Sequence, residues 1–320
     1  MEIVTATAGL DSNNVAPSRV PLQGARCFPF CQAFSIQFKR LIVTLFQRPC
    51  HANVVLAVAT ALSCSACERH LIPWTPDPRV AHADTAFMSG GVRIAVERMA
   101  PLRSGRHPLV LVLHGSDGPD GNGGQYVRGY ADQLALNGYV AYVVHYFDRT
   151  GTTRSDDALE DREFPIWTET LRDAITFAQH DSSVDARRVG AFGFSLGGYM
   201  SLALGASDPR VGSLVVLGGG FFKALAPRVT HLPPTLLLHG GDDTVVPLHE
   251  AEKVAEALAR LHVAHQLVVF PGAGHVFTVN RTEGTAVRAI RWFDRYVNGR
   301  WWRRILPLRQ TSRTTVTSSN

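Results

Sequence analysis

The stretch Gly193-Phe194-Ser195-Leu196-Gly197-Gly198 lies between a short apolar run, residues 189–192, and a helical pattern over residues 196–204. A GxSxG motif between a strand and a helix holds its serine on a sharp, strained turn. Larger side chains beside the serine would collide with the neighbouring strand and helix, which explains the glycines. The turn presents the hydroxyl at the helix N-terminus, beside backbone N–H groups that can receive a developing oxyanion. The motif therefore predicts that Ser195 is a nucleophile. The alternative is a glycine-rich helix entry without chemistry.

Strand and helix patterns alternate on both sides of this turn. Residues 85–88 and 92–99, which flank Gly90-Gly91, predict a hairpin. The alternation predicts an α/β fold with a mostly parallel open sheet and helices on both faces. Ligands of such sheets bind beyond the carboxyl ends of the strands. Buried strands are expected at 109–113, 140–144, 189–192, 214–217, 235–238 and 266–270, and helices at 126–136, 166–179, 196–204, 249–261 and 285–297.

Two later strand ends supply the partners that a serine nucleophile needs. Asp242 and Asp243 follow the strand at 235–238, and His275 follows the last strand in a loop of small residues. The chain order of serine, acid and histidine matches this type of hydrolytic site. From position alone either aspartate can be the acid, and the other then stabilises the turn. The alternative for His275 is a helix-entry residue.

Two other histidines, His239 and His145, also lie near carboxyl ends of strands. Neither follows the last strand, so both are interpreted as structural.

The loop after the first buried strand is the expected source of a second oxyanion donor. It contains Leu113-His114-Gly115-Ser116-Asp117-Gly118. The backbone N–H groups of Ser116 and Leu196 are predicted to form the pair of donors. His114 is expected to hold the loop by hydrogen bonds.

Composition excludes several protein classes. The 320 residues are 45% hydrophobic and 18% charged, with a mean hydropathy close to zero, which argues against collagen-like, disordered or multi-span membrane proteins. The net charge of +5 comes from the two ends, because residues 84–299 hold 20 Lys/Arg against 23 Asp/Glu. A nucleic-acid groove needs basic residues gathered on a folded face, so nucleic-acid binding is not expected.

Cysteine usage limits the chemistry of the predicted domain. All five cysteines precede residue 68, which excludes a disulfide framework, a thiolate metal site and a cysteine nucleophile after that point. No pair of histidines stands in an HExxH arrangement. The sequence therefore predicts no metal and no cofactor.

Residues 1–83 are expected to be mostly disordered, followed by a catalytic domain at 84–299 and a basic tail at 300–320. Within the first segment, Arg48 precedes an apolar run at 54–62 that fits the core of a secretory signal but is too short to span a bilayer. Its late position requires a translation start further downstream, near Leu41 or Val43, unless the run is a short buried helix. The cysteines that follow the run, Cys64 and Cys67, resemble a bacterial lipoprotein cleavage site, so membrane anchoring through a lipid on one of them is a further alternative. Export is favoured, and a cytoplasmic location remains open.

Four segments together resemble the dienelactone hydrolase family of α/β-hydrolases. They are Val184–Gly190 (VDARRVG), Gly193–Gly198, His239–Pro247 and Gly272–His275. The resemblance covers residues 85–299 and implies hydrolysis of an ester or lactone by Ser195, Asp243 and His275. It selects Asp243 over Asp242, because the family's acid follows the glycine of His-Gly by three residues. The family's own nucleophile is cysteine, so the dienelactone substrate does not carry over to this serine.

A lid domain is not expected, because only 17 residues, 218–234, separate two predicted strands. The acyl site should then be open. Tyr146, Phe147, Phe221 and Phe222 lie at the correct sheet edge to form its walls, although core packing is an equal alternative. The polar segment 148–157 is interpreted as a mobile loop over the site.

These features predict a serine hydrolase that acts on small carboxylic esters or lactones and needs no cofactor. One alternative is a peptidase of the prolyl-oligopeptidase type, which usually carries a further domain. Another is a binding protein that keeps the fold without catalysis, which would be expected to lack a triad member. The oligomeric state and the acyl and alcohol groups of the substrate stay open.

Overall fold

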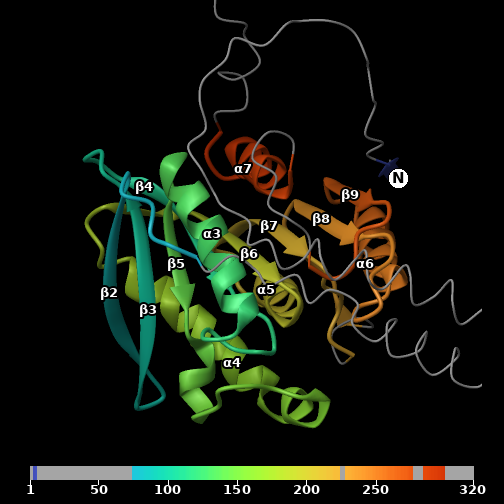
Figure 1. Ribbon diagram of the computed structural model, residues 1–320, viewed down its shortest axis with the longest axis horizontal. Coiled ribbons are helices and arrows are strands. Elements are labelled where there is room, and N and C mark those ends of the chain that lie inside the picture. The colour runs from blue at the N-terminus through green and yellow to red at the C-terminus, as the bar shows by residue number, and fades with distance from the viewer. Residues whose placement is uncertain (1–2, 6–73, 224–227, 277–283, 300–320) are drawn as a thin grey trace, which may run out of the picture. The chain divides into compact units, whose positions relative to one another are not determined.

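The computed structural model describes residues 3–5, 74–223, 228–276 and 284–299 (Figure 1). Within them, nine strands form one sheet in the order β1-β9-β8-β7-β6-β4-β5-β3-β2. Neighbours pair in parallel except β3, which is antiparallel to both β2 and β5. The strands are β1 (Ile3–Thr5), β2 (Val80–Ser89), β3 (Val92–Pro101), β4 (His107–Leu113), β5 (Val140–Val144), β6 (Val184–Phe194), β7 (Val211–Leu217), β8 (Thr235–Gly240) and β9 (His265–Phe270).

Helices cover both faces of this sheet (Figure 1). Successive strand side chains point to opposite faces, so Leu109 and Leu111 of β4 enter one core and Val110 and Val112 enter the other. Helices α4, α5 and α6 pack over the first core, and α3 and α7 over the second. The mostly parallel open α/β sheet with helices on both faces, which the alternating pattern predicts, is confirmed. The helices are α3 (Asn122–Leu136), α4 (Asp157–Ala178), α5 (Leu196–Ser207), α6 (Leu248–Arg260) and α7 (Thr285–Tyr296), with a 3₁₀ helix η1 (Tyr146–Thr150).

The folded domain begins earlier than the sequence predicts. Strand β2 starts at Val80, inside the segment expected to be mostly disordered, and it pairs antiparallel with β3 from Val80 to Ser89. Trp74 also packs against the folded domain, because its indole Nε1–H donates to Asp132 Oδ2 of α3 at 2.7 Å. His82 pairs with the other oxygen of Asp132 at 2.7 Å. The boundary at residue 84 is therefore wrong by about ten residues.

Helix α4 also starts earlier than expected, at Asp157 instead of residue 166. Pro165 directly precedes the expected start. Here it lies inside the helix, where it removes one hydrogen bond between turns. The true N-terminus is capped by the Asp156 side chain, which accepts from the Leu159 N–H at 2.9 Å. The helix therefore begins directly after the capping residue Asp156, and Pro165 lies within it.

Several expectations lie outside the described residues: the apolar run at 54–62, the lipid-attachment cysteines and the basic tail at 300–320. They stay predictions. In the described part of the chain, no helix combines the length and apolar character that crossing a membrane requires.

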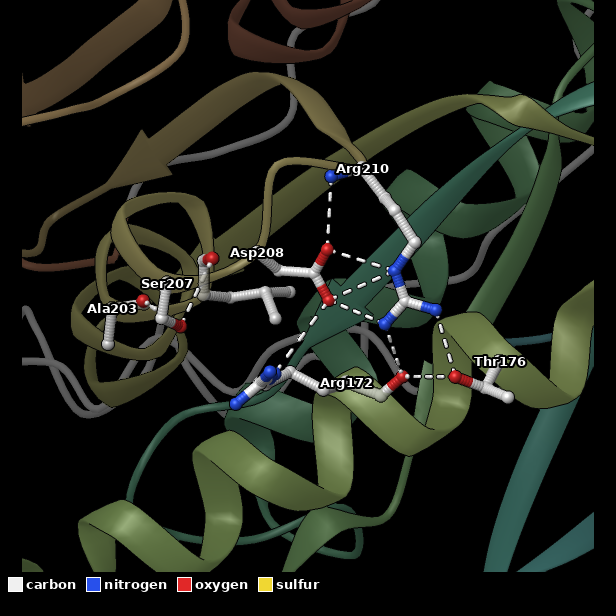
Figure 2. Close-up of polar contacts among 7 residues, drawn as sticks. Arg172, Thr176, Ala203, Ser207, Asp208 and Arg210 are labelled. Carbon is white, nitrogen blue, oxygen red and sulfur yellow. Dashed lines mark hydrogen bonds and ion pairs between the residues drawn. The ribbon is translucent and has the colours of Figure 1, made fainter.

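A charged cluster fastens α4 and α5 at the amino end of β7 (Figure 2). The buried carboxylate of Asp208 accepts from the Arg210 guanidinium at 2.5 to 3.1 Å. Arg210 also donates to the Arg172 carbonyl at 2.9 Å and to the Thr176 hydroxyl at 2.8 Å, both on α4. Arg172 Nε lies 3.9 Å from the same carboxylate. One aspartate thereby joins two helices and a strand, at the end of the sheet opposite Ser195.

We expect Asp208→Asn to lower stability by about 1 to 2 kcal/mol, because it weakens charge-assisted bonds to a partly exposed arginine. Burial opposes the charge on Asp208, but the bonds from Arg210 outweigh it and hold the pKa below its usual 3.8. The contribution is therefore complete above pH 3.8 and declines as the pH falls through the folded-state pKa. Urea unfolding at pH 7 and pH 3 measures both effects. Glu169→Gln, on the exposed side of α4, is the matched control; an equal loss there would contradict the role of Asp208.

Candidate active site

Ser195 occupies a strained turn between β6 and α5, with φ 55° and ψ −123°. Positive φ is uncommon for a residue with a side chain and is found at functional turns. Backbone crowding explains the glycines of the motif: a Cβ at Gly193 would lie 1.9 Å from the Gly197 carbonyl oxygen. A Cβ at Gly197 would lie 2.3 Å from the Leu113 carbonyl oxygen. The turn therefore tolerates a side chain at the serine but not at these two neighbours.

The structure brings Ser195 and His275 together from loops 80 residues apart. His275 Nε2 lies 2.9 Å from Ser195 Oγ, within hydrogen-bond distance. Gly218, with φ +59°, lies behind the imidazole, and a Cβ there would approach the ring to 3.3 Å. The ring of Phe194 packs on the imidazole with centroids 5.1 Å apart. These contacts hold the imidazole in a position to accept the serine proton.

Asp243 supplies the carboxylate behind the imidazole. Its Oδ2 lies 2.8 Å from His275 Nδ1, and its Oδ1 accepts from the N–H groups of Val245 and Val246, both at 2.9 Å. Its side chain is fully buried. Because a carboxylate only accepts, His275 Nδ1 must donate, which leaves Nε2 free to accept from the serine. Asp242 is exposed, so the structure brings only the expected one of the two aspartates into the site.

His239, interpreted as structural, supports the loop that carries Asp243. Its Nε2 lies 2.8 Å from the Val246 carbonyl oxygen and 3.5 Å from Asp243 Oδ2. Burial lowers the pKa of His239. A neutral imidazole with its proton on Nε2 donates to the Val246 carbonyl oxygen and closes the turn around the acid.

The loop after β4 lies against Ser195. A Cβ at Gly115 would approach the Ser195 Cβ to 3.3 Å. The Leu196 N–H is the first of helix α5 and has no acceptor within the helix. The Ser116 carbonyl accepts from the Ser155 N–H at 2.8 Å, and Asp117 accepts from the Gly123 N–H at 2.7 Å. The loop is thus tied both to α3 and to the segment before α4.

Two of the four expected pocket residues belong to the core instead. Tyr146 and Phe147 have no exposed surface, so their assignment as pocket walls is wrong for this conformation. Tyr146 stacks on His114, with centroids 4.2 Å apart and planes at 7°, and donates to the His114 carbonyl oxygen at 2.8 Å. Phe147 packs edge-on against the same imidazole at 4.8 Å. Residues at the end of a strand can point under the site loops as well as over them, and these two point under.

The other two aromatic residues lie beyond the end of β7. Phe221 is buried, whereas Phe222 is partly exposed and stacks on Phe164 of α4 at 4.0 Å. Their contact with a substrate stays a prediction.

The segment 148–157, interpreted as a mobile loop over the site, starts within η1 and ends at the first residue of α4. Its Ser155 N–H donates to the Ser116 carbonyl oxygen in the loop after β4. Its mobility stays a prediction.

Tyr199, one helical turn after Ser195, lies in an acidic environment that the sequence did not predict. A Cβ at Gly220 would lie 3.3 Å from the Tyr199 hydroxyl and 3.4 Å from Glu250 Oε2. Burial raises the pKa of Tyr199, and the carboxylates of Glu250 and Glu160 raise it further. Glu160, in the first turn of α4, has its own pKa raised to about 7 by burial and by Asp157. The i, i+4 spacing from Ser195 could have identified Tyr199, but no sequence signal places the two glutamates near it.

No group of three or more His, Cys, Asp or Glu side chains within the described residues is arranged to bind a metal ion. The expectation that the chemistry needs no cofactor stays a prediction.

Comparison with known proteins agrees with the geometry. The model of the dienelactone hydrolase family matches residues 95–307. A protein of Synechocystis sp. named "Putative carboxymethylenebutenolidase" is 27% identical over 208 residues, which cover 58% of this chain and 82% of that protein. The crystal structure of a dienelactone hydrolase from Anabaena variabilis superposes with a TM-score of 0.52 at 22% identity, over 68% of this chain and 99% of that one.

A peptidase shares the fold as well. Dipeptidyl peptidase 4 from Porphyromonas gingivalis matches with a TM-score of 0.56 at 16% identity, over 68% of this chain but only 36% of its own. At such identities the solved structures show the fold alone.

Proposed function

Because the chain belongs to the dienelactone hydrolase family, we propose that it is a serine hydrolase that cleaves small carboxylic esters or lactones through an acyl-enzyme on Ser195. One observation supports this proposal above all. Ser195 Oγ, His275 and Asp243 form a continuous hydrogen-bonded chain, with distances of 2.9 Å and 2.8 Å. A hydroxyl becomes an effective nucleophile when a base accepts its proton and a carboxylate orients that base.

The proposed reaction has two halves. His275 Nε2 takes the proton of Ser195 as its Oγ attacks the ester carbonyl carbon, and the carbonyl oxygen becomes an oxyanion. The N–H groups of Leu196 and Ser116 would donate to that oxyanion. The intermediate collapses when the imidazolium gives its proton to the departing alcohol oxygen. Water then attacks the acyl carbon while His275 takes its proton, and a second tetrahedral intermediate forms. It collapses as the imidazolium returns the proton to Ser195 Oγ, which releases the carboxylic acid and free Ser195.

Asp243 has a defined task in both halves. Its buried carboxylate keeps the proton of neutral His275 on Nδ1 and stabilises the imidazolium that forms in each half. The N–H groups of Val245 and Val246 hold it in place.

Serine in place of the family's cysteine bears on the substrate. A serine alkoxide must be generated during attack, whereas a cysteine can be a thiolate beforehand. Small esters and lactones of general type are therefore proposed, and the dienelactone reaction itself is not. The relatives named for carboxymethylenebutenolide support the ester and lactone bond type.

A peptidase of the prolyl-oligopeptidase type is the second candidate, favoured by the shared fold with dipeptidyl peptidase 4. Turnover of p-nitrophenyl esters compared with turnover of p-nitroanilides distinguishes the ester hydrolase from the peptidase.

We expect the purified chain to react with a fluorophosphonate at Ser195, as located by peptide mass spectrometry. It should hydrolyse p-nitrophenyl esters of short acyl chains and open a simple γ-lactone. The p-nitroanilides of aminoacyl and dipeptidyl groups should be cleaved far more slowly, because an amide carbonyl is less electrophilic. Efficient turnover of a dipeptidyl anilide, with a kcat/KM comparable to that of the matched ester, would favour the peptidase. An absence of both labelling and turnover would favour a binding protein.

A further inference from the structure

His114 belongs to the loop that faces Ser195, and its side chain is buried, with no exposed surface. Its Nδ1 lies 2.8 Å from the Gly115 carbonyl oxygen. A carbonyl oxygen can only accept, so Nδ1 carries a hydrogen and donates it. The same oxygen also accepts from the Gly118 N–H at 3.1 Å. Two donors from different parts of the loop thus hold one carbonyl group.

The proton on Nδ1 is the only one that this imidazole holds at neutral pH. Burial lowers the pKa of His114 to about 3, and the nearby Arg128 guanidinium acts in the same direction. Its Nε2 is buried and has no hydrogen-bond partner among the described residues. A second proton there would leave a charged donor without an acceptor, which is costly. The imidazole is therefore neutral and is a permanent donor to the Gly115 carbonyl.

The direction of this carbonyl decides where the Ser116 N–H points. In a planar trans peptide, the C=O of one residue and the N–H of the next point in opposite directions. Gly115 lies against the nucleophile, because a Cβ there would approach the Ser195 Cβ to 3.3 Å. The hydrogen bond from His114 holds the Gly115 oxygen toward the imidazole. It therefore holds the Ser116 N–H pointing away from the imidazole.

The imidazole itself cannot turn. Tyr146 stacks flat on one face at 4.2 Å, and Phe147 packs edge-on at 4.8 Å. The Tyr146 hydroxyl donates to the His114 carbonyl oxygen at 2.8 Å, which fixes the backbone on the other side of the residue. Both aromatic residues are fully buried. Their role is to fix the donor, which explains large aromatic side chains at this position without substrate contact.

We propose that His114 is a positioning residue that orients the Gly115–Ser116 peptide so that the Ser116 N–H faces the oxyanion formed on the carbonyl that Ser195 attacks. This role rests on the proposed function, because it acts through the transition state of ester hydrolysis. His114 touches no reacting atom.

Two amide substitutions separate this role from packing. The side-chain amide nitrogen of Asn can occupy the position of His Nδ1, whereas that of Gln falls near Nε2. His114→Asn therefore keeps a donor to the Gly115 oxygen, and His114→Gln moves the same chemical group away from it. His114→Phe keeps a flat ring for the Tyr146 stack and removes the donor. Melting temperatures of all three chains record any loss of packing.

We expect kcat for a p-nitrophenyl ester to fall about 10- to 100-fold in His114→Gln and His114→Phe. This loss is smaller than the 10²- to 10³-fold cost of removing an oxyanion donor, because the Gly118 N–H still donates to the Gly115 oxygen. KM should stay within about threefold, because the interaction strengthens only in the transition state. His114→Asn should stay within about fivefold of the wild type in kcat. A thionoester of the same acyl group gives a second readout. Sulfur accepts hydrogen bonds weakly, so the preference for ester over thionoester should shrink in the Gln and Phe variants only.

Wild-type kcat in His114→Gln, equal losses in the Asn and Gln variants, or an unchanged ester preference despite a lower kcat would each overturn the positioning role. If the Gln chain does not fold, the comparison of Asn with Phe decides by the same criteria. These outcomes are distinct from failure of the proposed function. In that case the wild-type chain would show neither turnover nor fluorophosphonate labelling at Ser195, and the role of His114 would fall with it.

Discussion

Ser195→Ala should abolish ester hydrolysis, with a loss in kcat on the order of 10⁶-fold. The substitution removes the atom that bonds to the substrate, and neither His275 nor Asp243 can replace it. A residual acceleration of about 10³ to 10⁴ over water is the most that the oxyanion donors and substrate binding supply without the nucleophile. Initial rates with a p-nitrophenyl ester, checked for contaminating esterase by fluorophosphonate titration, measure the loss.

The fold should survive this change. The positive φ at residue 195 is imposed by backbone contacts at Gly193 and Gly197, and an alanine meets the same strain as the serine. The melting temperature should therefore stay close to that of the wild type. Ser207→Ala is the matched control on the same helix. The Ser207 hydroxyl donates to the Ala203 carbonyl oxygen at the far end of α5 (Figure 2), and its loss should leave the rate unchanged. Retained turnover in Ser195→Ala would refute the nucleophile assignment.

Asp243→Asn should lower kcat by about 10⁴-fold. The carboxylate accepts three donors: the N–H groups of Val245 and Val246 and the Nδ1–H of His275. An asparagine amide has one acceptor oxygen, which the two N–H groups already need. Its NH₂ group would then face His275 Nδ1 and favour the tautomer protonated on Nε2. That tautomer cannot accept the serine proton.

Asp242→Asn is the control for this prediction, because Asp242 is the adjacent residue and its side chain is exposed. The change should alter kcat by less than about threefold, since its backbone N–H bond to the Ala273 carbonyl remains. Rates measured across pH 5 to 9 show whether any loss in Asp243→Asn is a shifted pH profile or a lower plateau. Equal losses in the two variants would mean that the acid of the triad is misassigned.

The sequence predicts this site well where local backbone requirements decide it. Gly193 and Gly197 are needed because carbonyl groups approach them closely, and that constraint is visible as GxSxG. The position of His275 follows from its place after the last strand, because parallel strands bring their carboxyl ends to one edge of the sheet. Asp243 needed the family resemblance, since two adjacent aspartates satisfy the same positional rule.

Sequence reasoning fails where the direction of a side chain depends on tertiary packing. Tyr146 and Phe147 follow strand β5 at the correct edge, but they turn inward and pack on His114. Nothing in their local sequence distinguishes a residue under the loop from one facing the substrate. The charges near Tyr199 show the same limit, because Glu160 and Glu250 come from different helices. Their effect on the pKa of Tyr199 appears only when α4, α5 and α6 are assembled.

The contact between Gly197 and the end of β4 has a consequence for how such an enzyme can evolve. A Cβ at Gly197 would lie 2.3 Å from the Leu113 carbonyl oxygen and 2.7 Å from the His114 carbonyl oxygen. The helix that offers one proposed oxyanion donor thus rests directly on the backbone that leads to the other. The spacing of the two donors is set by main chain against main chain, with no variable side chain between them. Because this spacing depends on backbone contacts at a glycine, it can be inherited unchanged while side chains elsewhere in the chain vary.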